Sequence, residues 1–194
     1  MGLAIPLSLE PMEAQSVDDL PSGAGWQFEP KWDGFRALAF RDGDKVFLQS
    51  RNQRPLGRYF PELIRALGSL PIPRFVLDGE IIIRNQPFDE LQLRLHPAAS
   101  RIADLAETQP ATFVAFDLLA NRRGDSLLDL PLSKRRKALD SFFKSFPKNG
   151  FILKSRSMRS QAQPSNGSRA EGTASTVLWP SDWTSPIVPA NGRC

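Results

Sequence analysis

A β-hairpin signal between residues 35 and 50 constrains the fold more than any other feature. Two runs rich in strand-forming residues, FRALAF at 35–40 and KVFLQS at 45–50, flank the sequence RDGD. Its Asp42-Gly43 pair favours a tight reversal, because glycine adopts the backbone angles that such turns need. The sequence therefore predicts two antiparallel strands joined by a short turn.

Further strands and helices are expected around this hairpin. Apolar and β-branched runs predict strands at 26–29, 75–83, 111–119 and 149–154. Apolar residues at helical spacing predict helices at 58–70, 88–95, 100–107 and 133–146, the last with Ser133 as its N-cap. This mixture indicates an α+β (loosely α/β) fold of antiparallel sheets with packed helices.

Composition divides the chain into three parts. Residues 1–25 are interrupted by proline and glycine and are expected to form an irregular lead-in, and residues 26–154 hold the predicted strands and helices. Residues 155–194 are rich in Ser, Pro, Gly and Arg and contain none of the 13 phenylalanines. We expect no strand or helix there and predict that this tail is disordered or foreign to the fold.

The overall composition narrows the class of protein. The 194 residues are 41% hydrophobic and 24% charged, as in an ordinary globular domain, and the net charge of +4 favours an anionic partner such as nucleotide or nucleic acid. His96 and Cys194 are the only histidine and cysteine, which excludes a disulfide framework and zinc sites built on several such residues. No apolar run reaches membrane-spanning length, and no basic region precedes the short apolar stretch at the N-terminus. We therefore expect a cytoplasmic protein with no membrane partner.

Lys31 is the candidate reactive residue. It lies in EPKWDGFR, residues 29–36, where Gly34 allows close approach of the backbone. On its own, a Lys-X-Asp-Gly sequence is equally compatible with a solvated surface lysine. The surrounding charges decide between a surface lysine and a nucleophile.

Charged residues at the ends of the predicted strands indicate a binding site. Arg36, Arg51 and Glu80 would be costly to bury there unless a bound ligand pairs with them. Two arginines and a lysine suit phosphate, and a glutamate can accept hydrogen bonds from ribose hydroxyls. Phe116 is a candidate aromatic surface for a base, with a core position as the alternative. Together these residues predict a nucleotide site.

Four segments, taken in order, resemble motifs of the covalent nucleotidyltransferases, the superfamily of DNA ligases, RNA ligases and mRNA capping enzymes. EPKWDGFR resembles motif I, SRN at 50–52 motif Ia, FVLDGEI at 75–81 motif III and FVAFDLL at 113–119 motif IIIa. The Pro11-Met12 pair and the FPEL stretch at 60–63 are most similar to bacterial ATP-dependent DNA ligases of the end-joining type. The resemblance runs from about Pro11 to Lys154 and implies part of a ligase adenylation domain.

The resemblance also implies a role for each candidate residue. Lys31 would attack the α-phosphorus of ATP and form a lysyl-AMP phosphoramidate, from which AMP passes to a DNA 5′-phosphate before the nick is sealed. Glu29 and Phe116 would contact the adenine base. Arg36 and Arg51 would contact the ribose and phosphates. Glu80 would bind the ribose and a divalent metal ion (Mg²⁺ or Mn²⁺). Nicked or broken DNA is the implied substrate, with end-joining proteins as further partners.

Motifs IV and V of the family, which carry a metal-binding carboxylate and phosphate-binding lysines, are not readable after Lys154. Read one nucleotide upstream, residues 174–186 (ASTVLWPSDWTSP) can be back-translated into a stretch that resembles motif IV. We therefore hypothesise that a frameshift near residue 155 produced the tail. Two alternatives stay open: another covalent nucleotidyltransferase, such as an RNA ligase or capping enzyme, and a truncated, inactive remnant that binds nucleotide or DNA.

Three other charged features are expected to be structural. Asp33 and Asp78 each precede a glycine, where an aspartate commonly closes a turn through its own backbone hydrogen bonds. The basic run KRRK at 134–137 is expected to be a solvated helix start, with DNA contact as the alternative.

Overall fold

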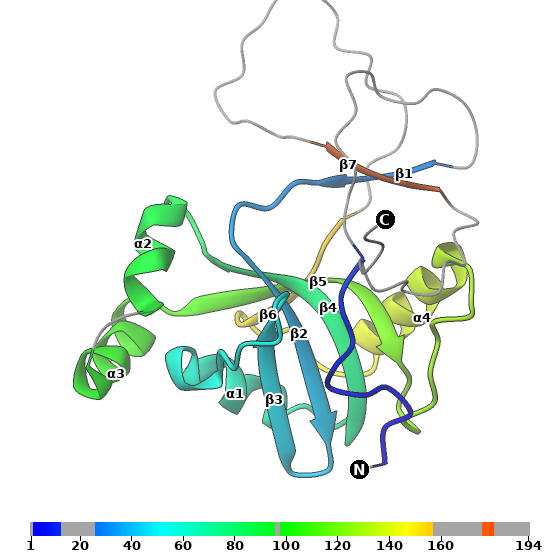
Figure 1. Ribbon diagram of the computed structural model, residues 1–194, viewed down its shortest axis with the longest axis horizontal. Helices are drawn as coiled ribbons and strands as arrows, with labels where there is room; N and C mark the ends of the chain where they lie inside the picture. The colour runs from blue at the N-terminus through cyan, green and yellow to red at the C-terminus, as the bar shows by residue number, and fades with distance from the viewer. Residues whose placement is uncertain (1, 13–25, 96–97, 157–175, 181–194) are drawn as a thin grey trace, which may run out of the picture.

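A five-stranded sheet is the centre of the fold (Figure 1). The computed structural model describes residues 2–12, 26–95, 98–156 and 176–180. The strands run in the order β3-β2-β4-β5-β6, with the bounds β2 Phe35–Asp42, β3 Lys45–Ser50, β4 Arg74–Ile83, β5 Ala111–Ala120 and β6 Ile152–Lys154. Neighbouring strands are antiparallel except β5 and β6, which are parallel. The predicted α+β class is confirmed, with a mixed sheet where a purely antiparallel one was expected.

The hairpin between β2 and β3 forms as the sequence predicts. Asp42 pairs with Lys45 across the turn, and Gly43 has a φ of +62°, a left-handed conformation that favours glycine. A side chain at residue 43 would meet no atom within 4 Å, so glycine is needed there for its backbone angle and not for space.

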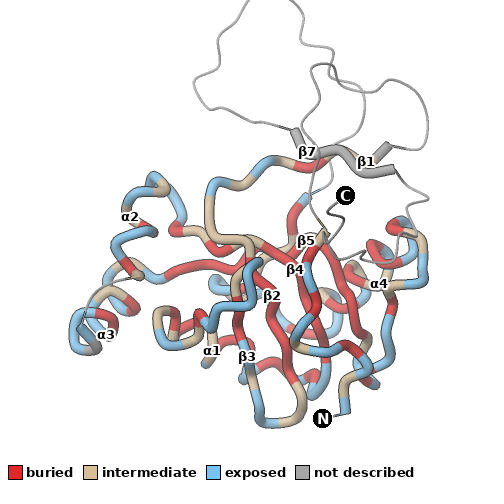
Figure 2. Tube along the Cα trace, viewed as in Figure 1, coloured by how far each residue is buried: buried red, intermediate tan, exposed pale blue. Residues whose placement is uncertain are grey.

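Helices cover one face of the sheet, which we call the helix face. The helices are α1 (Pro61–Gly68), α2 (Phe88–Gln92), α3 (Ala99–Thr108) and α4 (Leu132–Lys144), with short 3₁₀ turns at Gly57–Tyr59 and Leu93–Leu95. Alternate strand residues face these helices and are fully buried (Figure 2), among them Ala37, Ala39, Leu77 and Ile81. They pack against apolar side chains of α1 and α4, which include Leu63, Leu67, Leu139 and Phe142. The parallel pair β5–β6 is possible because α4 carries the chain back between them.

The opposite face of the sheet is divided between two environments. Residues 2–12 form no helix or strand, yet Ile5 and Leu9 are buried against an apolar half of this face made of Leu38, Phe40, Val76 and Leu119. Farther along, the face carries four residues that we call the charged end: Arg36, Asp78, Glu80 and Phe116. The end of the N-terminal segment reaches the charged end, where the carbonyl oxygen of Met12 accepts from Arg36 at 3.3 Å.

The structure also contains a second sheet of two strands, which is separate from the five-stranded sheet (Figure 1). It pairs β1 (Trp26–Pro30) antiparallel with β7 (Thr176–Pro180). The expectation that no strand follows residue 154 is therefore wrong. The run TVLWP contains strand-favouring residues, but it is too short to reveal a period, and its pairing with β1 depends on distant backbone. The frameshift origin of the tail stays a prediction.

Helix α4 begins differently from the prediction. Its N-cap is Pro131, whose carbonyl accepts hydrogen bonds from the amides of Lys134 and Arg135, and Ser133 lies inside the first turn. The predicted cap at Ser133 is wrong because the extended backbone of Pro131 already provides the first acceptor of the helix. His96 lies outside the described residues. Within the described chain, none of the helices combines the length and the apolar character that crossing a membrane requires.

Candidate nucleotide-binding site

Lys31 is exposed in the short loop that joins β1 to β2. Gly34 fixes the path of this loop, because a Cβ atom there would lie 2.1 Å from the carbonyl oxygen of Ile81 in β4. The indole nitrogen of Trp32 donates to the hydroxyl of Ser155, 3.3 Å away, and so anchors the loop to the residue after β6. The side chain of Lys31 stays exposed, and its charge acts on the carboxyl of Glu80 at the charged end.

Arg36 and Asp78 form the central ion pair of the charged end. The guanidinium of Arg36 makes two bonds to the carboxylate, Nε to Oδ1 at 2.7 Å and Nη2 to Oδ2 at 2.8 Å. Its central carbon lies 4.2 Å from the centroid of the Phe116 ring, a cation–π contact. Asp78 lies in the middle of β4, so the prediction that it closes a turn is wrong. Its Asp-Gly sequence belongs to a strand in which Gly79 gives space to the ring of Phe113, 2.6 Å from where a Cβ would stand.

Glu80 is the titratable group of the site. Burial raises the pKa of its carboxyl to about 7, with further upward pressure from Asp78 and Asp33 and an opposing effect from Arg36 and Lys31. Near neutral pH the side chain is therefore divided between its protonated and ionised forms. A cation or a hydrogen-bond donor bound beside it would favour the carboxylate.

A β-bulge presents Phe116. Asp78 pairs with Asp117 and Gly79 pairs with Ala115, which leaves Phe116 as the extra residue on β5. Bulges re-aim side chains in this way near ligand sites. The ring is only partly buried, so the core alternative for Phe116 does not describe its environment.

Buried ion pairs of α4 support this end of the sheet. Arg135 binds both carboxylate oxygens of Asp117, at 3.1 and 2.9 Å, and Arg136 binds Glu29 at 2.8 Å. The two arginines are 2% and 6% exposed, so the expectation of a solvated basic run is wrong at these two positions. Burial raises the pKa of Glu29 and of Asp117, and each arginine opposes that effect for its partner. Lys134 and Lys137 of the same run are exposed, as predicted.

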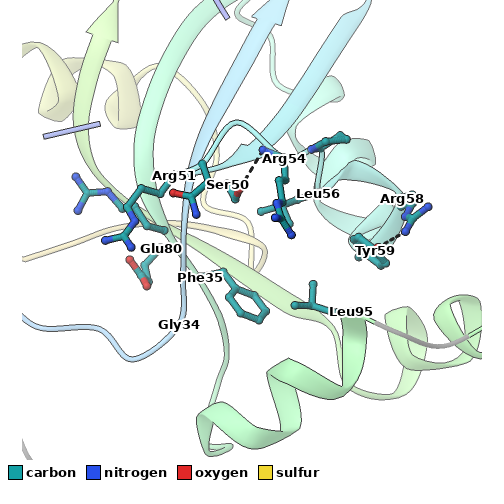
Figure 3. A pocket seen from close by; sticks show the side chains of 13 residues that line it. Gly34, Phe35, Ser50, Arg51, Arg54, Leu56, Arg58, Tyr59, Glu80 and Leu95 are labelled. Atoms are coloured by element: carbon teal, nitrogen blue, oxygen red, sulfur yellow. Dashed lines mark hydrogen bonds between the residues drawn. The ribbon is translucent and has the colours of Figure 1, made fainter. Parts of the chain in front are cut away.

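Two hollows meet at Arg36. The larger, of about 770 Å³, runs from Gly34, Glu80 and Arg51 toward Arg54, Arg58 and Tyr59 (Figure 3). The smaller is lined by residues that include Glu29, Asp78 and Phe116. The structure thus brings Arg36, Arg51 and Glu80 into one pocket as expected, and places Glu29 and Phe116 at the adjoining hollow. Lys31 lines neither hollow, but its charge acts on Glu80.

Several site residues were missed from the sequence. Alternation in FVLDGEI places Asp78 and Glu80 on the same face of a strand, a signal that was available and not used. The carboxylate partners of Arg135 and Arg136 are Asp117 and Glu29, which lie 18 or more residues away in sequence, and no local pattern identifies them. Arg54 and Arg58 follow motif Ia without a motif of their own.

Metal binding would rely on few protein ligands. Among the described residues there is no cluster of three His, Cys, Asp or Glu side chains that could hold an ion. A site with one carboxylate suits Mg²⁺, which keeps several waters and takes substrate phosphates as ligands. Glu80, a carboxylate in a pocket with Arg36 and Arg51, fits that arrangement.

Comparison with known proteins shows the family of the chain. The family model described as "ATP dependent DNA ligase domain" matches residues 11–165. The chain is 51% identical over 148 residues to DNA ligase C1 of Mycolicibacterium smegmatis, covering 72% of this chain and 42% of the relative. It is 50% identical over 142 residues to DNA ligase C of Mycobacterium tuberculosis, covering 72% and 39%. The chain therefore spans about two fifths of the length of these relatives.

A solved structure shares the fold. It is described as mycobacterial DNA ligase D complexed with ATP and MES, and it superposes with a TM-score of 0.61 at 27% identity. The match covers 79% of this chain and 47% of that one.

Proposed function

Because the chain belongs to the ATP-dependent DNA ligase family, we propose that Lys31 becomes covalently joined to AMP in the first step of DNA sealing. The observation that carries the proposal is an exposed lysine whose charge acts on Glu80, a residue that lines one pocket with Arg36 and Arg51. An amine at such a place can attack a phosphate that the two arginines orient and neutralise.

The proposed chemistry begins at the amine of Lys31. Its nitrogen, after losing a proton to solvent, forms a bond to the α-phosphorus of ATP, and the bond from that phosphorus to the oxygen bridging the β-phosphate breaks. Pyrophosphate leaves with that electron pair. The AMP then passes to a DNA 5′-phosphate, and the 3′-hydroxyl across the nick displaces AMP to form the phosphodiester.

The remaining site residues bind and orient the nucleotide. We assign Phe116 and Glu29 to adenine, Arg36 and Arg51 to the ribose and phosphates, and Glu80 to a ribose hydroxyl. Glu80 would also hold Mg²⁺ or Mn²⁺ together with the phosphates, and such an ion supplies positive charge that neutralises the triphosphate. The pKa of Glu80, raised to about 7, suits a group that becomes fully ionised when a cation arrives.

DNA is the proposed second substrate. Exposed Arg54 and Arg58 extend the larger pocket away from Glu80 (Figure 3), and the guanidinium of Arg58 lies 4.4 Å from the centroid of the Tyr59 ring. Arginines beside an aromatic ring suit a phosphodiester backbone and its bases. Action on nicks or broken ends, cooperation with end-joining proteins and a cytoplasmic location stay predictions.

Intact-mass measurement after incubation with ATP and Mg²⁺ tests the proposal. The parent chain is expected to gain the mass of AMP, Lys31→Ala is expected to gain nothing, and Lys45→Ala, on the exposed hairpin, should behave as the parent. An adduct on Lys31→Ala would contradict the assignment. A folded parent without an adduct would favour the remnant alternative, and nicked DNA against nicked RNA would separate DNA sealing from RNA ligase chemistry.

The origin of the tail is a separate proposal. We propose that residues from about 155 onward derive from a shifted reading frame of the same family, supported by the motif IV-like back-translation of residues 174–186. The family model reaches residue 165, within the first part of this tail. Sequencing the coding DNA tests it, and a locus with no ligase-like frame there would contradict it.

A further inference from the structure

Arg136 connects every segment that meets at the adenine end of the site. Its Nη1 forms an ion pair with the Glu29 carboxylate at 2.8 Å and donates to the carbonyl oxygen of Phe116. Its Nη2 donates to the carbonyl oxygen of Ser155 at 2.7 Å. Since Ser155 accepts from Trp32, this one guanidinium also reaches the loop that carries Lys31.

The bulge explains why Phe116 needs such a partner. As the extra residue on β5, Phe116 has no pairing residue opposite it on β4. Arg136 bonds its carbonyl oxygen and so fixes the backbone from which the ring projects. The bulge and the arginine together determine where a base could stack.

Glu29 is held through one carboxylate oxygen. Gln27 donates to its Oε1 and Arg136 forms an ion pair with the same oxygen, so Oε2 is the atom that we assign to the ligand. The side chain is 4% exposed and lines the small hollow beside Phe116. A carboxylate so deep in the protein would take up a proton without a paired cation, and Arg136 is its closest one.

The protonation state of Glu29 would decide which purine it accepts. An ionised carboxylate only accepts hydrogen bonds, which matches the exocyclic amino group of adenine. Hypoxanthine and guanine carry an acceptor oxygen at that position. That oxygen and the carboxylate are both acceptors, so no hydrogen bond could form between them. A protonated Glu29 could donate to that oxygen, so the discrimination would disappear.

We propose that Arg136 is a positioning residue that sets base specificity, holding Glu29 as an ionised acceptor and Phe116 in place so that the site prefers adenine to hypoxanthine. This inference rests on the proposed function, because it takes Glu29 and Phe116 as the base contacts. It adds a residue that touches neither the base nor the reacting atoms.

The test compares the α,β-methylene analogues of ATP and ITP, which share ribose and phosphates and cannot transfer the nucleotide. Calorimetry on the full chain is expected to give a dissociation constant about ten-fold lower for the ATP analogue. Arg136→Met should bring the two analogues within about two-fold of each other, and Arg136→Lys should keep the preference because it keeps the charge. Arg94→Met removes an equally buried arginine paired with Glu62 and should leave the ratio unchanged.

Each outcome decides the inference. An unchanged ratio in Arg136→Met, even with weaker binding of both analogues, would overturn it, as would a parent chain that binds both equally. If Arg136→Met does not fold, Glu29→Gln serves, since an amide both donates and accepts, and a ratio unchanged there would contradict the inference. If the parent gains AMP but Arg136→Met keeps the parent's ratio of dissociation constants, only the role assigned to Arg136 is contradicted. If the parent neither binds the ATP analogue nor gains AMP, both the role of Arg136 and the proposed function are contradicted.

Discussion

The helix face and the charged end lie on opposite sides of the same strands and differ in what holds them together. On the helix face, Ala37, Leu77 and Ile81 are fully buried among other apolar side chains. On the charged end, Arg36 and Asp78 are held by an ion pair, and burial raises the pKa of Glu80. The first face contributes stability through apolar area, and the second keeps charges in place for a ligand.

The largest effect on stability is expected on the helix face. Phe142→Ala removes a ring that packs edge-on against Phe75, Phe143 and Phe146, with centroids 5.2 to 5.6 Å away. We expect a loss of about 3–5 kcal/mol in the free energy of unfolding, measured by urea denaturation. Phe151→Ala, at an exposed phenylalanine, should cost far less. Equal losses would mean that the helix face is not the main source of stability.

Asp78→Asn is expected to have the next largest effect, because it leaves the Arg36 guanidinium without its carboxylate. Breaking a buried pair of this kind costs about 3 kcal/mol, reduced here because Arg36 is 22% exposed. Asp33→Asn changes another aspartate that precedes a glycine, one that is exposed, and should shift the urea midpoint little. Equal effects at the two positions would restore the turn-closing interpretation of Asp78.

A pH-dependent difference is expected at Glu80. Folding raises its pKa from the ordinary 4.5 to about 7, so the stabilising contribution of the protonated form is present below 4.5 and is lost as the pH rises through 7. Glu80→Gln does not titrate and should be more stable than the parent at pH 8 by about 1–2 kcal/mol, with the gap closing by pH 4.5. Unfolding curves at the two pH values measure it. A gap that is constant with pH would mean that burial does not perturb this carboxyl.

The smallest effect is expected at the arginines beyond the nucleotide pocket. Arg54→Ala and Arg58→Ala should each weaken binding to nicked duplex DNA and lower the slope of log affinity against log salt by about 1. Arg101→Ala, at an exposed arginine of α3, is the matched control and should leave the slope unchanged. A slope that changes at Arg101 as much as at Arg54 would place DNA on a different surface.

Sequence patterns revealed the helix face and only part of the charged end. The hairpin at Asp42-Gly43 and the apolar side of α1 follow from turn chemistry and helical spacing, which are local. Arg135 and Arg136 can be buried because the fold places the carboxylates of Asp117 and Glu29 beside them. The basic run by itself gave no sign of these partners and so predicted exposure to solvent. Strand β7 likewise forms through pairing with distant β1.

The candidate site shows the same division. Resemblance in the four motifs identified Lys31, Arg36, Arg51 and Glu80, and the structure gathers the last three around one pocket. The way these residues are held was not foreseeable, because the pairing of Arg36 with Asp78 and the bulge at Phe116 depend on strand register. Their individual roles with nucleotide stay predictions.

Peptide mapping of the chain after incubation with ATP and Mg²⁺ tests the central claim most directly, because it identifies the residue that carries the nucleotide. The account predicts AMP on the peptide containing Lys31 and on no other lysine. AMP on Lys45 of the hairpin or on Lys154 of β6 would contradict the claim that the charged end is the reactive site. So would a folded chain that binds ATP with Lys31 unmodified.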